Sequence, residues 1–332
     1  MVSIRDVAKH AGVAISTVSK VVNNYPNVSE ETKKKVNASI KELNFIPNTI
    51  ASALSSKQAG RVALLMNLST RKQSIDEIGM QYLIGAINQC TELNLDVITV
   101  FYSMLKDKNV EEVEQYFRSQ SISGIIIYGM SKDDKVLQQL IEAQVFKIVV
   151  IDTPFVNENT SSVWIDQKAA QKEVARKTIT ENAPNRSDRI LYISGTENGY
   201  ITSERTAAMK ELAEEMNLKL TICCGNFREA QAREITFKHA KDIDIIVCAS
   251  DLMAIGAMKA LIDMDIFKPV CGFDGITLMG YAGKQMNTVR QNFSSISEEA
   301  VKELARLMSG GTGINTVLPH EIVRLRYEDI IL

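Results

Sequence analysis

From residue 61 onward, strand-length apolar runs alternate with stretches of helical spacing, and this alternation restricts the fold more than any other feature. The first strands expected are RVALLM (61–66), DVITVF (96–101), GIIIYG (124–129) and KIVVID (147–152), with helices near 76–92, 109–119 and 134–143. Near-continuous Val, Ile and Leu strands separated by helices are typical of parallel sheets that helices cover on both faces.

The same alternation then starts again. Its strands are expected at SSVWID (161–166), RILYIS (189–194), LTICC (220–224), DIIVCA (244–249) and KPVCGFD (268–274), with helices near 168–180, 203–216, 228–240 and 251–263. About ten strands are too many for one compact sheet. We therefore expect an effector-binding and dimerisation domain over 61–332 with two lobes. The N-lobe is expected at about 61–160 plus 290–320, and the C-lobe at about 161–289 plus 321–332.

The first 46 residues have a different pattern, with two helices of eight residues expected at 4–11 and 15–22. Ala8 is small enough for the helices to approach each other, Gly12 suits the positive φ of the turn, and Val18 fills the gap between the axes. The spacing predicts a helix-turn-helix.

A third helix is expected near 30–43, with Ser29 as its N-cap. It completes a three-helix headpiece over 1–46. Pro47 ends the headpiece, and residues 47–60 are expected to form one more short helix and a linker.

Charge is distributed unevenly along the chain. Residues 1–60 hold eight Lys and Arg against four Asp and Glu, a net charge of +4, whereas the remaining residues carry −6. A small basic head on an acidic body indicates a polyanion-binding module attached to a second function.

Other sequence features exclude several classes of protein. Arg5, Asp6 and Lys9 interrupt the N-terminus, so no secretory leader is expected, and no apolar run reaches the length of about 18 residues that a membrane span needs. Three cysteines lie in apolar segments, namely Cys90, Cys248 and Cys271. This favours buried thiols in a reducing, cytoplasmic compartment. With only three histidines, no metal site is expected, and no cofactor motif is present.

Six stretches in a fixed order give the chain a resemblance to the lactose/galactose repressor family of transcription regulators. They are IRDVAKHAGVAISTVSKVVNN, VSEETKKKV, ELNFIPNTIASAL, CASDLMAIGAMKAL, CGFD and NTVRQN. The resemblance covers the whole chain and is strongest in the first 60 residues. It implies a homodimeric repressor that binds pseudo-palindromic operator DNA.

The resemblance also implies which residues contact DNA. Ile15, Ser16 and Lys20 match base-reading positions on a helix that enters the major groove. The matching phosphate contacts are Thr17, Ser19, Asn23, Ser29 and Thr32. Residues 47–60 would be the hinge helix and linker, with Asn48, Ala51 and Leu54 at the DNA and Leu54 as a minor-groove wedge. Ala14 departs from the family, which usually has a serine there.

Several aspartates follow the expected strands, where the carboxyl ends of parallel sheets bind ligands. They are Asp152, Asp166, Asp251 and Asp274. Each can instead cap the next helix. The resemblance implies effector contacts by Asp166, Arg205, Asp251, Asp274 and Gln291, and the effector implied is a sugar or sugar derivative. For Arg205 the alternative is a local ion pair with Glu197 or Glu204.

One departure weakens the case for an ordinary hexose. The segment NLSTRKQSIDEIG (67–79) has no aromatic residue where the family usually has a ligand-stacking pair. Possible substitutes are Tyr128, Phe155, Trp164 and Tyr200.

Two alternatives remain open at this point. The regulator could answer to a partner protein instead of a small molecule, or the chain could be an α/β enzyme with a DNA-binding head. The sequence contains no G-x-G-x-x-G after its first strand, no Walker A motif and no G-x-S-x-G, which counts against the enzyme.

Overall fold

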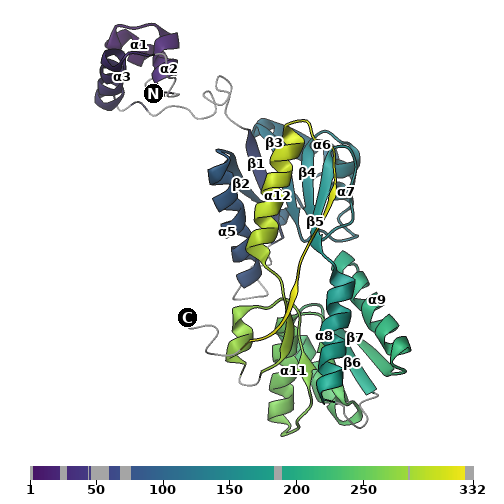
Figure 1. Ribbon diagram of the computed structural model, residues 1–332. Helices are drawn as coiled ribbons and strands as arrows, with labels where there is room; N and C mark the ends of the chain where they lie inside the picture. The colour runs from purple at the N-terminus through teal and green to yellow at the C-terminus, as the bar shows by residue number, and fades with distance from the viewer. Residues whose placement is uncertain are drawn as a thin grey trace. The chain divides into compact units, whose positions relative to one another are not determined.

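The computed structural model describes residues 3–22, 28–43, 45, 60–67, 76–182, 189–282 and 285–325. The chain separates into two compact units, Met1–Gly60 and Arg61–Leu332 (Figure 1). Within the described parts, none of the helices has the length and apolar character that a membrane crossing requires.

The described part of the first unit contains three helices around a small apolar core. They are α1 (Ile4–Ala11), α2 (Ile15–Val22) and α3 (Glu30–Glu42). Val7, Ala8, Val18 and Val36 are buried together, which confirms the helix-turn-helix pattern. Gly12 has φ +66°, and its N–H donates to the Ala8 carbonyl to end α1.

A serine is the N-cap residue of both α1 and α3. The expected Ser29 cap is present, because its Oγ accepts from the Thr32 N–H at 3.3 Å. A second cap was not predicted: the N–H and Oγ of Ser3 both donate to the Asp6 carboxylate, at 2.8 and 2.7 Å. A carboxylate three residues after the cap satisfies one of the unpaired donors at a helix start.

The second unit begins with a fully parallel six-stranded sheet in the order β11-β5-β4-β3-β1-β2. Its strands are β1 (Arg61–Met66), β2 (Asp96–Phe101), β3 (Ile122–Tyr128), β4 (Lys147–Ile151), β5 (Thr160–Ile165) and β11 (Asn315–Leu318). One face is covered by α5 (Glu77–Glu92) and α12 (Phe293–Met308), which lie side by side in Figure 1, and the other by α6 (Val110–Ser119) and α7 (Lys135–Glu142). These elements are the N-lobe.

A second six-stranded sheet follows in the order β12-β10-β9-β8-β6-β7, parallel except for the β10–β12 pair. Its strands are β6 (Arg189–Ser194), β7 (Lys219–Cys224), β8 (Ile245–Cys248), β9 (Val270–Cys271), β10 (Asn287–Arg290) and β12 (Glu321–Arg324). The helices are α8 (Gln167–Asn182), α9 (Tyr200–Glu215), α10 (Glu229–His239) and α11 (Asp251–Asp263), with 3-10 turns η1 (Tyr102–Met104), η2 (Ala240–Asp242) and η3 (Thr277–Tyr281). These elements, apart from η1, are the C-lobe.

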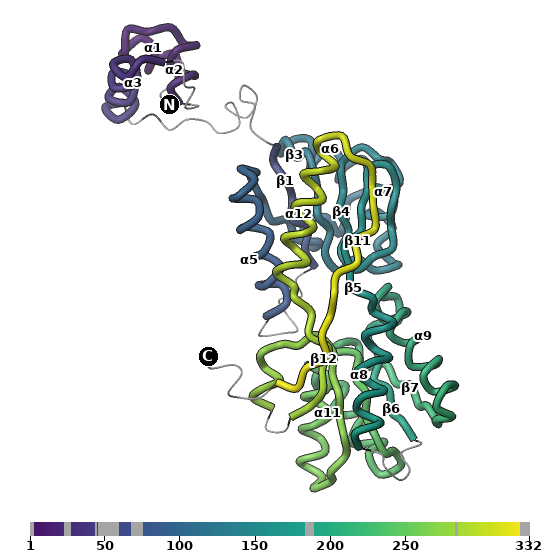
Figure 2. The backbone as a smooth tube through the Cα atoms, in the orientation of Figure 1, coloured from purple at the N-terminus to yellow at the C-terminus, as the bar shows by residue number. Residues whose placement is uncertain are grey.

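The chain passes between the lobes at three crossovers. The first joins β5 to α8, the second joins β10 to α12, and the third joins β11 to β12. Figure 2 shows the yellow C-terminal segment returning through β11 and ending as β12 in the C-lobe.

The expected start of the C-lobe at residue 161 is wrong. β5 pairs in parallel with β4, with Ile148 opposite Thr160, and also with β11. The connection over 152–159 contains no helix, so the strand after it resembles the start of a new repeat although it extends the first sheet. Apolar pattern alone does not say which sheet a strand joins.

Two further expectations concern the cysteines and the hinge helix. Cys90, Cys248 and Cys271 are buried free thiols, as predicted. The hinge helix expected over 47–60 lies, except for Gly60, outside the described residues.

Candidate functional site

The second helix of the headpiece has one buried face and one exposed face. Val18 and Val21 face the core, whereas Ser16 and Lys20 are exposed and Ile15 is 46% exposed despite being aliphatic. An exposed apolar residue and a lysine on one short helix are suited to the major groove, where they can meet a thymine methyl and a guanine edge.

The remaining headpiece candidates fall into two groups. Thr17, Ser19 and Thr32 are half-buried, and Ser29 is exposed with its Oγ 2.8 Å from the Thr32 hydroxyl. Asn23, Asn48, Ala51 and Leu54 lie outside the described residues.

Arg205 of α9 lies at the centre of the 61–332 unit and is only 2% exposed. Its Nε donates to Gln167 Oε1 at 2.9 Å and its Nη1 to the Ala249 carbonyl at 2.5 Å. The guanidinium carbon lies 3.4 Å from the centre of the Phe273 ring, and Nη1 is 3.8 Å from Asp274 Oδ1. The local ion pair with Glu197 or Glu204 is therefore not the arrangement found.

Two aspartates, one from each lobe, approach this arginine with unusual backbones. Asp152, directly after β4, has φ +54°, and Asp274, after β9, has φ +125°. Non-glycine residues in such regions cost about 1–3 kcal/mol each and cluster at functional sites. Asp152 follows a strand of the N-lobe and Asp274 follows a strand of the C-lobe. In open α/β sheets, residues at these strand ends are the ones that bind ligands.

Gln167 connects the two lobes through this cluster. Its Nε2 donates to Asp152 Oδ1 at 2.8 Å while its Oε1 accepts from Arg205. Asp274 Oδ1 in turn accepts from Gln291 Nε2 at 3.2 Å. Residues from the loop after β4, from α8 and α9, from the loop after β9 and from the β10–α12 crossover therefore meet in one buried cluster. We call it the Arg205 cluster (Asp152, Gln167, Arg205, Asp274 and Gln291).

Asp251 does not lie at a ligand surface, which corrects its assignment as an effector contact. It is fully buried; its Oδ1 accepts from the Thr288 hydroxyl at 2.6 Å, and its Oδ2 accepts from the N–H groups of Gly275 and Ile276 at 2.8 and 2.9 Å. These bonds hold the loop that carries Asp274. Asp251 is a positioning residue.

Asp166 has the capping role that the sequence left open. It is exposed, and its Oδ1 accepts from the Ala169 N–H at 2.8 Å at the start of α8. Within the described contacts it makes no bond to the Arg205 cluster, so its assignment as an effector contact is not supported by the geometry.

Burial dominates the electrostatics of the cluster. It raises the pKa of Asp274 to about 8 against the opposing effect of Arg205, and it raises the pKa of Asp152 as well. It also raises the pKa of Asp251 to about 6, against its hydrogen bonds to Thr288, Ile276 and Gly275. One guanidinium thus faces more carboxylates than it can neutralise, so the cluster favours protons or hydrogen-bond donors.

An aromatic wall beside the cluster was missed at the level of sequence. The Tyr82 hydroxyl is 3.5 Å from Asp152 Oδ2, and its ring centre lies 4.9 Å from Tyr128 and 5.2 Å from Phe293. Tyr128 was one of the predicted aromatic substitutes. Tyr82 carries no sequence signal of its own, because its spacing on α5 is that of an ordinary core-facing residue.

The other three aromatic candidates lie away from this wall. Phe155 and Tyr200 pack edge to face at 5.7 Å where the lobes meet. Trp164 is half-buried in β5, and its indole N–H has no hydrogen-bond partner among the described groups.

Direct contacts hold the lobes together on two sides of the Arg205 cluster. On one side Glu77 of α5 accepts from the Thr277 N–H at 2.8 and 2.9 Å and from its hydroxyl at 2.7 Å. On the other, the Lys132 N–H donates to the Asn198 carbonyl at 2.9 Å, and Asn198 Nδ2 donates to Asp133 at 2.6 Å. Hydrogen bonds therefore link the two lobes directly in this structure.

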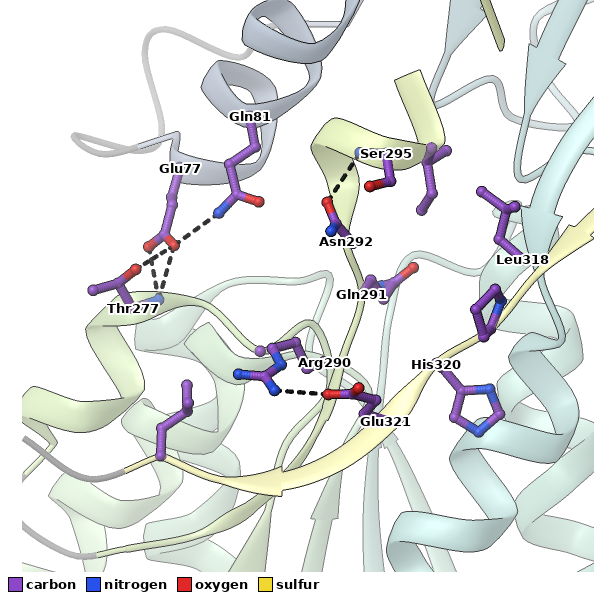
Figure 3. Close-up of a pocket in the computed structure, with 14 residues that line it drawn as sticks. Glu77, Gln81, Thr277, Arg290, Gln291, Asn292, Ser295, Leu318, His320 and Glu321 are labelled. Atoms are coloured by element: carbon purple, nitrogen blue, oxygen red, sulfur yellow. Dashed lines mark hydrogen bonds and ion pairs between the residues drawn. The ribbon is translucent and has the colours of Figure 1, made fainter. Parts of the chain in front are cut away.

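A pocket of about 700 Å³ lies beside the cluster (Figure 3). Gln291 lines it, but neither Arg205 nor Asp274 does. The cavity and the buried charges are therefore adjacent features that share one residue.

The pKa of Asp274 predicts how stability depends on pH. The native state retains the Asp274 proton up to a pKa of about 8, whereas the unfolded state releases it near 3.8. The stability of the 61–332 unit should therefore fall as pH rises between these values, by at most about 1.4 kcal/mol per pH unit, and change no further through this group above pH 8.

Asp274→Asn should reduce this slope, which urea unfolding at pH 5, 7 and 9 measures. The facing groups Arg205, Asp152 and Asp251 remain in both proteins, so the difference reports the loss of the Asp274 carboxyl together with its effect on these neighbours. An identical slope in the variant would contradict the assignment.

The chain is similar to two protein families and to several named regulators. Residues 3–48 match the model for bacterial regulatory proteins of the lacI family, and residues 70–312 match a periplasmic binding protein domain. The chain is 28% identical over 336 residues to catabolite control protein A of Staphylococcus aureus (strain MRSA252), covering 97% of each protein. It is 29% identical over 306 residues to the ribose operon repressor of Halalkalibacterium halodurans, covering 88% of this chain and 86% of that repressor.

Solved structures share the fold across the whole length. The lac repressor dimer bound to operator and the anti-inducer ONPF superposes with a TM-score of 0.82 at 22% identity, over 97% of this chain and 98% of that one. The complex of the transcriptional regulator CelR with cellobiose gives 0.70 at 23% identity, over 98% and 99%. This chain belongs to the lacI family of bacterial regulatory proteins, with a DNA-binding helix-turn-helix ahead of a periplasmic binding protein domain.

Proposed function

We propose that this protein is a repressor whose affinity for a specific operator is set by a small molecule, a sugar or sugar derivative, bound between its two lobes. The observation that carries the proposal is the Arg205 cluster, in which charged groups from both lobes are buried together at strand ends. A ligand that replaces contacts there changes the relative stability of open and closed lobes, and only such differential binding can shift a conformational equilibrium.

The carboxyl groups of Asp152 and Asp274 suit a ligand rich in hydroxyl groups, because a carboxyl group accepts hydrogen bonds from hydroxyl groups and also donates one while it is protonated. Arg205 already stacks on Phe273 and donates to protein groups, so its role is to fix the cluster and to offer its remaining N–H groups. The names of two relatives, a ribose operon repressor and a cellobiose-bound regulator, support a carbohydrate.

Small-molecule control is favoured over control by a partner protein. The polar 67–79 segment gave reason to consider a protein partner, yet the buried rings of Tyr82, Tyr128 and Phe293 pack together next to Asp152 and supply aromatic groups from other elements. The curated relatives are named as regulators, and we propose no catalytic activity for this chain.

We also propose that the protein binds its operator as a homodimer on a pseudo-palindromic site. Met80, Ile84 and Ile87 form one exposed apolar stripe along α5, at 58%, 48% and 47% exposure. Apolar residues at this spacing on an exposed helix mark an association surface. The similar lac repressor structure is described as a dimer.

Each headpiece would use one set of contacts with its half-site. Base contacts are assigned to Ile15, Ser16 and Lys20, and phosphate contacts to Thr17, Ser19, Asn23, Ser29 and Thr32. The hinge contacts Asn48, Ala51 and Leu54 complete the proposed interface in the minor groove.

Lys20→Ala tests the DNA-reading half of the proposal. We expect a loss of about 1–3 kcal/mol on an operator obtained by selection from random duplexes, with little change on random DNA. Fluorescence anisotropy at one fixed salt concentration gives both affinities.

Lys34→Ala is the matched control, since Lys34 is an exposed lysine on α3 with no assigned base contact. Equal losses on operator and random DNA for Lys20→Ala would show a phosphate contact instead of base reading.

A further inference from the structure

We propose that Cys223 and His239, which meet at the edge of the C-lobe sheet, bind a soft monovalent metal ion of the Cu(I) class. The Cys223 Sγ lies 3.8 Å from the His239 Nε2. The sequence did not predict this pair, because the two residues are 16 positions apart and only the fold brings them together. Neither residue belongs to the Arg205 cluster or to the headpiece, so the inference goes beyond the proposed function.

Packed elements hold both donors in place. Cys223 lies in the edge strand β7, opposite Ile193 of β6. His239 is the last residue of α10, close in sequence to the buried residues Thr236 and Ala240. Both donor residues are half-buried. Each is therefore fixed by its surroundings and still accessible to an ion from solution.

The distance between the two atoms suits donors that share one ion. Bonds of about 2.3 Å to sulfur and about 2.0–2.1 Å to imidazole nitrogen, as for zinc, put two donors about 3.5–4.4 Å apart over bond angles from tetrahedral to linear. The observed 3.8 Å lies within this interval. Binding forms a metal–sulfur and a metal–nitrogen bond and breaks the S–H bond, whose proton passes to the solvent. No electron is transferred, so copper stays Cu(I).

The donor set selects a soft ion that needs few protein ligands. Thiolate sulfur favours Cu(I) over hard cations. A structural zinc site has four protein ligands, and among the residues that the structure describes no group of three Cys, His, Asp or Glu side chains could hold a metal. A monovalent ion leaves the pair neutral, because the thiolate cancels its charge. A divalent ion would add a positive charge to that of Lys238, which acts on Cys223.

Cys224 is a natural control for the site. Successive residues of a strand point to opposite faces of the sheet. The Cys224 Sγ lies 3.1 Å from the Gly195 carbonyl oxygen and 3.3 Å from the Asn226 Oδ1. The same strand thus presents one thiol beside an imidazole and another thiol beside oxygen acceptors.

The test uses the full-length protein, reduced and kept free of oxygen, with Cu(I) supplied as its bicinchoninate complex. The absorbance of that complex falls as the protein takes the ion, which gives the stoichiometry and the affinity. We expect the chain to take a single Cu(I). In nitrogen-15 NMR spectra the His239 Nε2 signal should shift, while the signals of His10 and His320, the other two histidines, stay unchanged.

Three variants show which side chains hold the ion. Cys223→Ser should abolish the uptake of Cu(I) from bicinchoninate. His239→Ala should weaken binding at least about 100-fold, since even second-shell partners change metal affinity by about 10–100-fold. Cys224→Ser should bind as wild type. Thermal unfolding without copper checks the fold of each variant, and the His239 signal of the unsubstituted chain tests the site without any variant.

The proposal is overturned if the chain takes no Cu(I) from bicinchoninate or if the His239 signal does not shift. Wild-type affinity in Cys223→Ser or His239→Ala, or loss of binding in folded Cys224→Ser, would also overturn it. Tighter binding of Zn(II) than of Cu(I) would contradict the class of ion.

Discussion

We expect Arg205→Ala to abolish the effect of the proposed effector on operator affinity and to destabilise the C-lobe. The side chain is buried with four partners from three segments of the chain, namely Gln167, the Ala249 carbonyl, and Phe273 with Asp274. Removing one member of a buried charge network typically costs about 3–5 kcal/mol, because the remaining charges lose their compensation. Urea unfolding should show a loss of this size, and operator affinity without effector should stay close to wild type.

Two variants separate the charge from the geometry. Arg205→Lys keeps the positive charge but lacks the planar fork that reaches Gln167 and Ala249 together, so it should restore part of the stability and little of the effector response. Arg233→Ala removes an exposed arginine paired with Asp263 at 2.6 Å and should change neither. A normal effector response in Arg205→Ala would contradict the role assigned to the cluster.

Ile84→Glu should convert the protein into a monomer with weak operator binding. Ile84 lies at the middle of the exposed Met80–Ile84–Ile87 stripe, so a two-fold interface over α5 would bring two new carboxylates together in an apolar contact. Loss of the second headpiece removes its contribution to avidity, about 10²–10⁴-fold in operator affinity.

Analytical ultracentrifugation and anisotropy on the same samples measure both effects. Val156→Glu, a change at an equally exposed apolar residue outside α5, serves as the control and should remain dimeric. A stable dimer of Ile84→Glu with full operator affinity would show that the dimer forms through another surface.

Local signals were enough to place most elements of the fold. α1 and α2 begin and end at the predicted residues, since Gly12 and the apolar spacing around Val18 determine them locally. β5 was assigned to the wrong lobe because membership of a sheet depends on the register with β4 and β11. Their paired residues are 12 positions away for Ile148 and Thr160, and 153 positions away for Leu318 and Ile165. That information is not contained in the apolar pattern of the strand itself.

The sequence pointed to some residues of the Arg205 cluster but not to the residues that pack around them. Arg205, Asp274 and Gln291, which the resemblance implied as effector contacts, lie together in one buried cluster. Asp166 and Asp251 carry the same strand-end pattern, yet one caps α8 and the other holds the Gly275 loop, because an aspartate at such a position can bond either way. Gln167 and Tyr82 have no distinguishing pattern, and only the three-dimensional packing brings them to Asp152.

Selection of bound DNA from a random duplex library by the full-length protein tests the central claim most directly. An inverted repeat should emerge, and the affinity for it at physiological salt should exceed that for random DNA by at least about 10³-fold. The half-sites should be read in the same way by two copies of α2, so Lys20→Ala should relax selection at symmetric positions of both. Recovery of no common sequence, or of a single unrepeated half-site bound as tightly as any longer duplex, would contradict a dimeric operator-specific regulator.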